Sequence, residues 1–71
     1  MNATDWLTAF AEKLGTAPPS SDEFKSILDL AAQAAHASER VAAPAACWVA
    51  ASARADLTEA LAKAKQITQD G

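Results

Sequence analysis

The feature that most constrains this chain is its shortage of large apolar side chains. Hydrophobic residues make up 51% of its 71 residues, but more than half of them are alanine. Burying a leucine or phenylalanine contributes about 1.5 to 3 kcal/mol, whereas alanine offers roughly one methyl group. A chain of this length also buries only about 60% of the surface that its unfolded form exposes. We therefore expect one small domain of thin stability, covering residues 1–71.

Charge and apolar run length exclude two classes of partner. The net charge is −3, so the chain lacks the basic excess that drives binding to a phosphate backbone. The longest uncharged run, Val41 to Ala53, falls far short of the roughly 20 residues that cross a bilayer. Residues 1–10 also show no basic segment ahead of an apolar one. The sequence predicts a cytoplasmic protein with no nucleic-acid or membrane partner, and its single Cys47 agrees with a reducing compartment.

Strong helix breakers at Gly15, Pro18, Pro19 and Pro44 predict an all-α fold, a small bundle of about four short helices. In the first helix Thr4 is a candidate N-cap and Gly15 a left-handed stop. Helical spacing places the large apolar residues of this segment on one face: Trp6, Leu7, Phe10 and Leu14.

The second helix is predicted to start with a capping box, because Glu23 follows Ser20 by three residues. One stripe of this helix is apolar: Phe24, Ile27, Leu28, Ala31 and Ala35. We expect the helix to fray near Ser38, since Ala43 precedes Pro44 and is pushed toward an extended conformation.

A third helix is expected from Pro44, at its first position, to about Ala53, and it is apolar on nearly every side. Asp56 and Glu59 form a second candidate capping box for a last helix. Its inward positions are expected to be Leu57, Ala60, Leu61, Ala64 and Ile67. One continuous helix through residues 52–56 is the alternative, since no glycine or proline enforces a break there.

The energetic consequence is an apolar surface that the chain cannot bury by itself. Three short amphipathic helices can hardly enclose a hydrophobic fourth, and large uncovered apolar patches mark interfaces. We predict a protein-binding surface that involves Trp48 or Trp6. Self-association through the same surface, giving a homodimer, is the alternative.

The stretch from His36 to Trp48 gathers most of the chemically distinctive side chains. His36 is expected to cap a helix end or to contact a partner, and it has too few neighbouring ligands for a metal site. Glu39 and Arg40 form either a solvated pair or, through the arginine fork, a grip on a carboxylate or phosphate. Cys47 lies in an apolar helix and is expected to act as a small hydrophobe rather than a nucleophile. We therefore expect no enzyme activity, metal or cofactor.

The segment "LDLAAQAAHASERVAAPAACWVA" resembles a small bacterial domain family of unknown function. That family occurs alone or fused to molybdenum cofactor guanylyltransferases, and it is encoded near formate dehydrogenase and its sulfurtransferase-type maturation protein. The resemblance covers most of residues 5–53. It rests on Trp6, Leu7, Leu14, Gly15, Leu28, His36, Glu39, Arg40, Ala43, Pro44 and Val49. The chain departs from the pattern at Val41, where proline is common, and lacks the glycine-rich end.

The resemblance implies a non-catalytic accessory module or small subunit for a molybdenum-cofactor enzyme system such as formate dehydrogenase. Its protein partner would be the molybdenum enzyme or a maturation factor. The residues expected to meet this partner are His36, Glu39, Arg40, Pro44, Trp48 and Val49.

Overall fold

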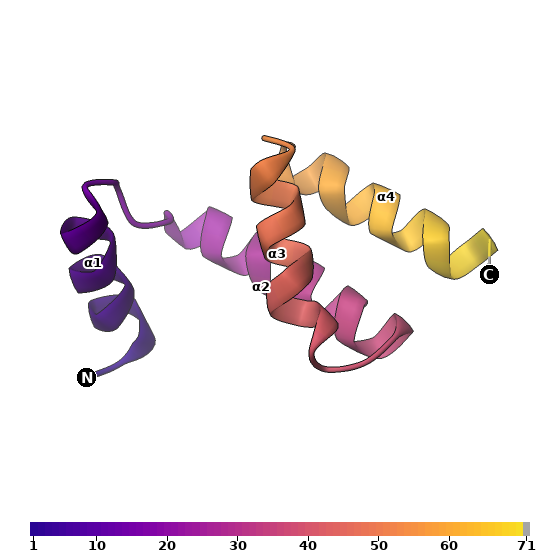
Figure 1. Ribbon diagram of the computed structural model, residues 1–71, viewed down its shortest axis with the longest axis horizontal. Coiled ribbons are helices and arrows are strands. Elements are labelled where there is room, and N and C mark those ends of the chain that lie inside the picture. Colours follow the sequence, from indigo (N-terminus) through magenta and orange to yellow (C-terminus); the bar gives the residue numbers. More distant parts are fainter. Residues whose placement is uncertain (71) are drawn as a thin grey trace.

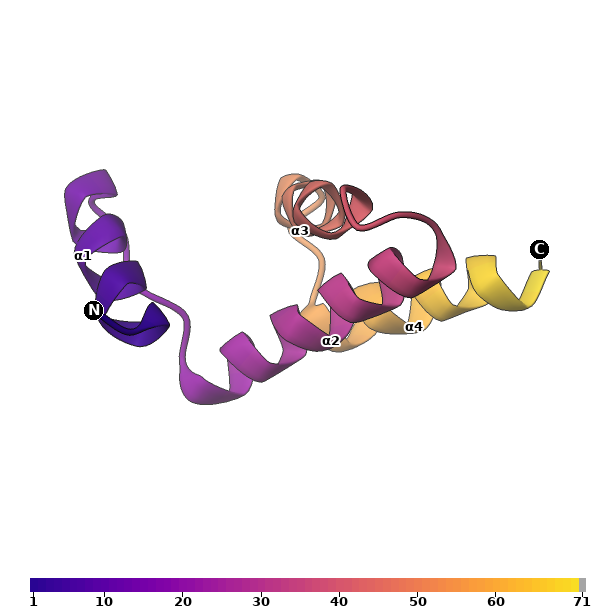
Figure 2. The same cartoon turned by 90° about the horizontal axis from the view of Figure 1, so that it is seen from below.

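The fold is all-α, as expected, and its helices are unequally packed. The computed structural model describes residues 1–70, with side chains described as far as residue 67. Its helices are α1 (Ala3–Leu14), α2 (Ser21–Ala37), α3 (Ala42–Ser52) and α4 (Leu57–Asp70). In Figures 1 and 2, α3 lies across α2, and α4 runs beside α2. Helix α1 stands at the N-terminal end of α2. The backbone extends over 39 × 22 × 18 Å.

Helix α1 begins two residues earlier than its expected cap allows. Asn2, and not Thr4, is the N-cap, because its side-chain oxygen accepts a hydrogen bond from the Asp5 amide at 2.8 Å. Thr4 lies inside the helix. The expected stop is confirmed: Gly15 has a left-handed φ of 76°, and its amide donates to the carbonyl of Ala11. Hydrogen bonds at each end of α1 thus pair backbone groups that lack the regular partner inside the helix.

The capping box expected at the start of α2 is present. The Glu23 amide donates to the Ser20 hydroxyl at 3.1 Å, and the Ser20 amide donates to the Glu23 carboxylate at 2.8 Å. Hydrogen bonding to the Glu23 carboxylate, mainly from the Ser20 amide and then from the Ser20 side chain, lowers the pKa of Glu23. A carboxylate whose folded pKa is lowered stabilises the fold above its unfolded pKa, and this contribution is lost as pH falls through the folded value.

Helix α3 begins at Ala42, so the expectation that Pro44 takes the first position was wrong by two residues. Pro44 is instead the third residue of the helix. Amides of the first turn have no intrahelical partner, so the proline sacrifices no hydrogen bond there. The turn is held by the amides of Ala42 and Ala43, which donate to the carbonyls of Glu39 and Arg40 at 2.9 and 3.1 Å.

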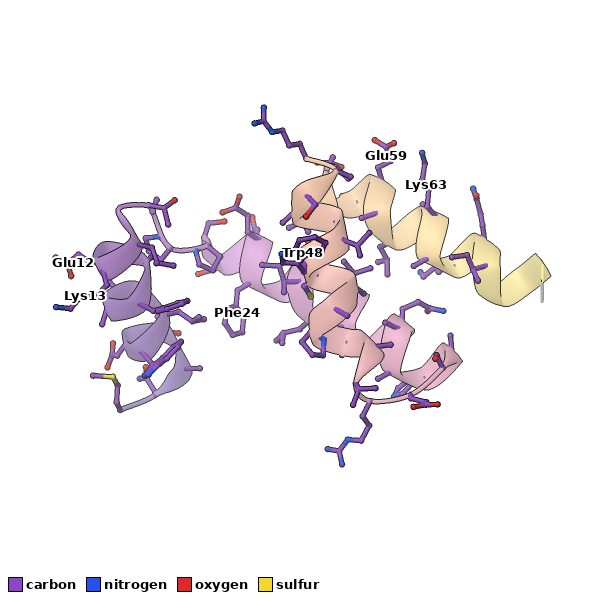
Figure 3. The ribbon with its side chains drawn as sticks, in the orientation of Figure 1. Glu12, Lys13, Phe24, Trp48, Glu59 and Lys63 are labelled. Atoms are coloured by element: carbon purple, nitrogen blue, oxygen red, sulfur yellow. The ribbon has the colours of Figure 1, made fainter. Side chains whose placement is uncertain are left out.

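Helices α3 and α4 are separate, so the alternative of one continuous helix is wrong. Arg54 adopts a left-handed φ of 55°, which turns the chain between them. Asp56 accepts a hydrogen bond from the Glu59 amide at 3.2 Å, which is one half of the expected capping box. The Glu59 carboxylate pairs with Lys63 instead, at 3.2 Å (Figure 3).

The core is small, and many large apolar side chains remain in solvent. Leu30 of α2 is 3% exposed, and it is the only large apolar residue among the described side chains that is buried; Ala11 and Ala50 are the others. Leu28 and Ile67, both expected to face inward, are exposed instead. The exposed large hydrophobic residues are Met1, Trp6, Phe10, Leu14, Leu28, Val41, Trp48, Val49 and Ile67.

None of the helices in the described part of the chain has the length and apolar character needed to cross a membrane.

The Ser20 cap gives a first test of what stabilises α2. Ser20→Ala removes the acceptor for the Glu23 amide and should lower the free energy of unfolding by about 1 kcal/mol. Chemical denaturation followed by circular dichroism measures this change. Ser21→Ala is the matched control, because Ser21 is exposed and its side chain makes no hydrogen bond with another described residue. An equal loss in both variants would contradict the cap.

The turn at Arg54 gives a second test. A side chain costs roughly 1 to 2 kcal/mol in the left-handed region, whereas glycine adopts it freely. Arg54→Gly should therefore raise the melting temperature in a thermal denaturation experiment. Ala53→Gly, at a neighbour with a right-handed φ of −79°, should lower it. A lower melting temperature for Arg54→Gly would show that the arginine side chain stabilises the turn.

Candidate partner-binding surface

Helix α3 carries an apolar face that is exposed to solvent. The helix has no charged residue, and positions spaced by three and four residues are all exposed: Val41 just before it, then Pro44, Ala45 and Trp48. Trp48, labelled in Figure 3, is 71% exposed and Val41 is 73% exposed. We call these four residues the α3 outer face. An indole left this open contributes almost nothing to the core of its own chain.

Polar side chains border the N-terminal end of this face. His36 lies in the last turn of α2, and Glu39 and Arg40 lie in the connection to α3. All three are exposed. Because the carbonyls of Glu39 and Arg40 are used by the first turn of α3, their backbone is fixed while their side chains remain free. Neither forms an ion pair with a described side chain, so the solvated Glu39–Arg40 pair does not form.

Val49 belongs to a different surface from Trp48. It lines an apolar groove of about 340 Å³ between α3 and α4, with Leu30 of α2 among its lining residues. The other lining residues are mostly small: Ala46, Ala50, Ala53, Ala55, Ala60, Lys63, Ala64 and Ile67. We call this the α3–α4 groove. The six residues expected to meet a partner therefore divide: Pro44 and Trp48 lie on the outer face, and Val49 lines the groove. His36, Glu39 and Arg40 precede the outer face in the chain.

The α3–α4 groove was not predicted from the sequence. Its signal was present, because α3 and α4 both carry alanine at helical spacing. Alanines allow two helices to approach closely, but here the alanines line the α3–α4 groove. The placement of α3 and α4 on α2, on either side of Leu30, depends on the turn at Arg54, which no local pattern reveals.

Cys47 lies on the inner side of α3. It is half-buried and lines a small pocket of about 140 Å³ whose other lining residues are all apolar. No titratable side chain lines this pocket with it. In the described part of the chain no group of three potential metal ligands comes together either. These surroundings offer a thiolate no base or positive charge, which a reactive cysteine needs.

The helices and these surfaces define a small all-α domain that leaves much of its apolar surface in solvent. A family model described as a domain of unknown function, DUF6457, matches residues 1–70, and the chain belongs to this family. No curated protein and no solved structure matches the chain.

The half-buried position of Cys47 predicts slow alkylation. N-ethylmaleimide at neutral pH should label the native chain several-fold more slowly than the denatured chain, because apolar side chains of α2, α3 and α4 partly cover the thiol. Mass spectrometry of quenched time points measures both rates. Rapid, stoichiometric labelling of native protein would instead support a reactive thiolate.

Proposed function

We propose that this chain is a non-catalytic protein-binding module, an accessory protein or small subunit of a molybdenum-cofactor enzyme system such as formate dehydrogenase. The observation that carries the proposal is Trp48, 71% exposed on a helix without charge. The site of action proposed is the cytoplasm, where a reducing environment would suit the single Cys47.

The α3 outer face has the composition of a binding hot spot. Tryptophan and arginine dominate the binding energy of protein interfaces, and they act best at the centre of a patch from which water is excluded. Trp48 supplies a rigid apolar anchor, flanked by Val41 and Pro44 on the same face. Burial of the indole against a partner would contribute a favourable free energy that the isolated domain lacks, because the indole is exposed there.

The polar side chains at the end of this face would fix the orientation of the partner. Arg40 carries a planar fork of donors that can bind a carboxylate in two hydrogen bonds. Its side chain has no partner among the described residues, so binding would break no existing ion pair. Glu39 and His36 lie nearby in the chain and would complement charges on the partner in the same way.

The molybdenum system enters through the resemblance of residues 5–53. The spacing of His36, Glu39–Arg40 and Pro44 is the part of that resemblance least easily produced by alanine-rich helices in general. All four residues are exposed, so packing within the chain does not account for their presence together. The family to which the chain belongs is described without a function, so the link to the molybdenum system rests on the resemblance of these residues.

The proposal predicts that binding and folding are separable at Trp48. Trp48→Ala should weaken binding of the partner by about 2 kcal/mol, or roughly 30-fold, while changing the free energy of unfolding by less than about 0.5 kcal/mol. Arg40→Ala should act in the same direction by a smaller amount. Affinity capture from native lysate with mass spectrometry identifies the partner, and calorimetric titration of purified formate dehydrogenase measures its affinity.

Trp6→Ala is the matched control, since it makes the same change at an exposed indole of α1. It should leave partner binding nearly unchanged. Equal weakening by both variants, or a parallel loss of fold and binding in Trp48→Ala, would contradict the proposal. Self-association through the outer face is the competing outcome, and it would appear as a dimer that Trp48→Ala dissociates.

A further inference from the structure

We propose that Arg54 is a second charged contact for the partner, and that the partner presents an apolar helix with acidic residues at both ends. This inference rests on the function proposed above, because it concerns binding along α3. It adds the chemistry that the partner must have. It also adds a contact residue at the opposite end of α3 from Arg40.

Arg54 occupies a backbone position that favours glycine. Its φ of 55° lies in the left-handed region, where a side chain is strained. Helices α1 and α3 end in the same kind of turn, in which the amides of the left-handed residue and of the next residue donate back to carbonyls of the last turn. In α1 the left-handed residue is Gly15, which carries no such strain. Helix α3 has an arginine at the equivalent position.

No contact within the described part of the chain accounts for this arginine. Its side chain is exposed, and it forms neither a hydrogen bond nor an ion pair with another described residue. Asp56, the acidic residue closest to it in the sequence, accepts a hydrogen bond from the Glu59 amide at 3.2 Å instead. A strained residue that gains nothing inside the fold points to a function outside it. We therefore assign the Arg54 guanidinium to an intermolecular contact.

The chain contains two arginines, and they flank α3. Arg40 lies shortly before the helix and Arg54 shortly after it, so helical rise separates them by about 20 Å along the axis. Both side chains are exposed, and α3 has no charged residue between them. Trp48 lies near the middle of this span. Figure 2, which looks along α3, shows that the helix lies on one side of α2.

The chemistry of the two guanidinium groups determines which partner fits. Each can bind a carboxylate through two parallel hydrogen bonds, which a lysine cannot do. Two cationic groups on a chain of net charge −3 do not suit a phosphate backbone. An apolar helix with acidic residues about 14 residues apart spans the same distance as the arginines. Such a helix would meet Trp48 with its apolar centre and both arginines with its ends.

Two synthetic helical peptides test this complementarity by fluorescence anisotropy. The acid-ended peptide carries glutamate pairs about 14 residues apart around a leucine-rich centre, and the base-ended peptide carries lysine pairs instead. The wild-type chain should bind the acid-ended peptide at least about tenfold more tightly than the base-ended one. Arg54→Gly should weaken binding of the acid-ended peptide at least about fivefold. The same change should raise the melting temperature, because it removes the strain, and a purely structural role would not produce these opposite effects.

Lys65→Ala is the control for charge, since it removes a positive charge from an exposed position on α4. It should leave the affinity for the acid-ended peptide nearly unchanged, whereas Arg40→Ala should act like Arg54→Gly on binding. Equal affinity for both peptides, no binding of the acid-ended peptide, or an unchanged affinity in Arg54→Gly would each overturn the inference. Binding of the acid-ended peptide without binding of formate dehydrogenase would support the inference and contradict the partner proposed above.

Discussion

The packing of α3 and α4 against α2 is the interaction on which the rest of the structure depends. Leu30 is the one large side chain that this packing buries among the described residues, and alanine supplies most of the remaining contact. Small side chains bring helices close together but recover little apolar free energy. The domain is therefore held by a narrow core, and its helix ends contribute a correspondingly large share of the stability.

The same constraint explains why the helix ends are so fully hydrogen-bonded. Asn2, the Ser20–Glu23 box and Asp56 each satisfy an amide at the start of a helix, and Gly15 ends α1 in a left-handed conformation. Each such cap contributes about as much as the burial of one methylene or two. Only α3 starts without a side-chain cap, and it is the helix with the most apolar composition.

Local chemistry made the helices predictable from the sequence. The Ser20–Glu23 box and Gly15 act over three or four residues, and the structure has both. The start of α3 was predicted two residues too late. Proline is tolerated throughout the first turn of a helix, so Pro44 indicates that a first turn is present but not which residue begins it. Ile67 was expected to be buried because helical spacing shows which residues share a face and not how far a partner helix extends. The packing of segments far apart in the sequence decides that extent. The same packing places Trp48 and Val49 on different surfaces.

That division gives α3 two separate apolar sides. Trp48 faces outward, whereas Val49 lines the groove, and the 100° between successive residues of a helix places both in solvent at once. A thinly stabilised domain gains free energy from anything that binds only its folded form. Binding at either side would therefore raise the free energy of unfolding of the domain. The two surfaces are physically distinct, yet they share the stability of one uncharged helix.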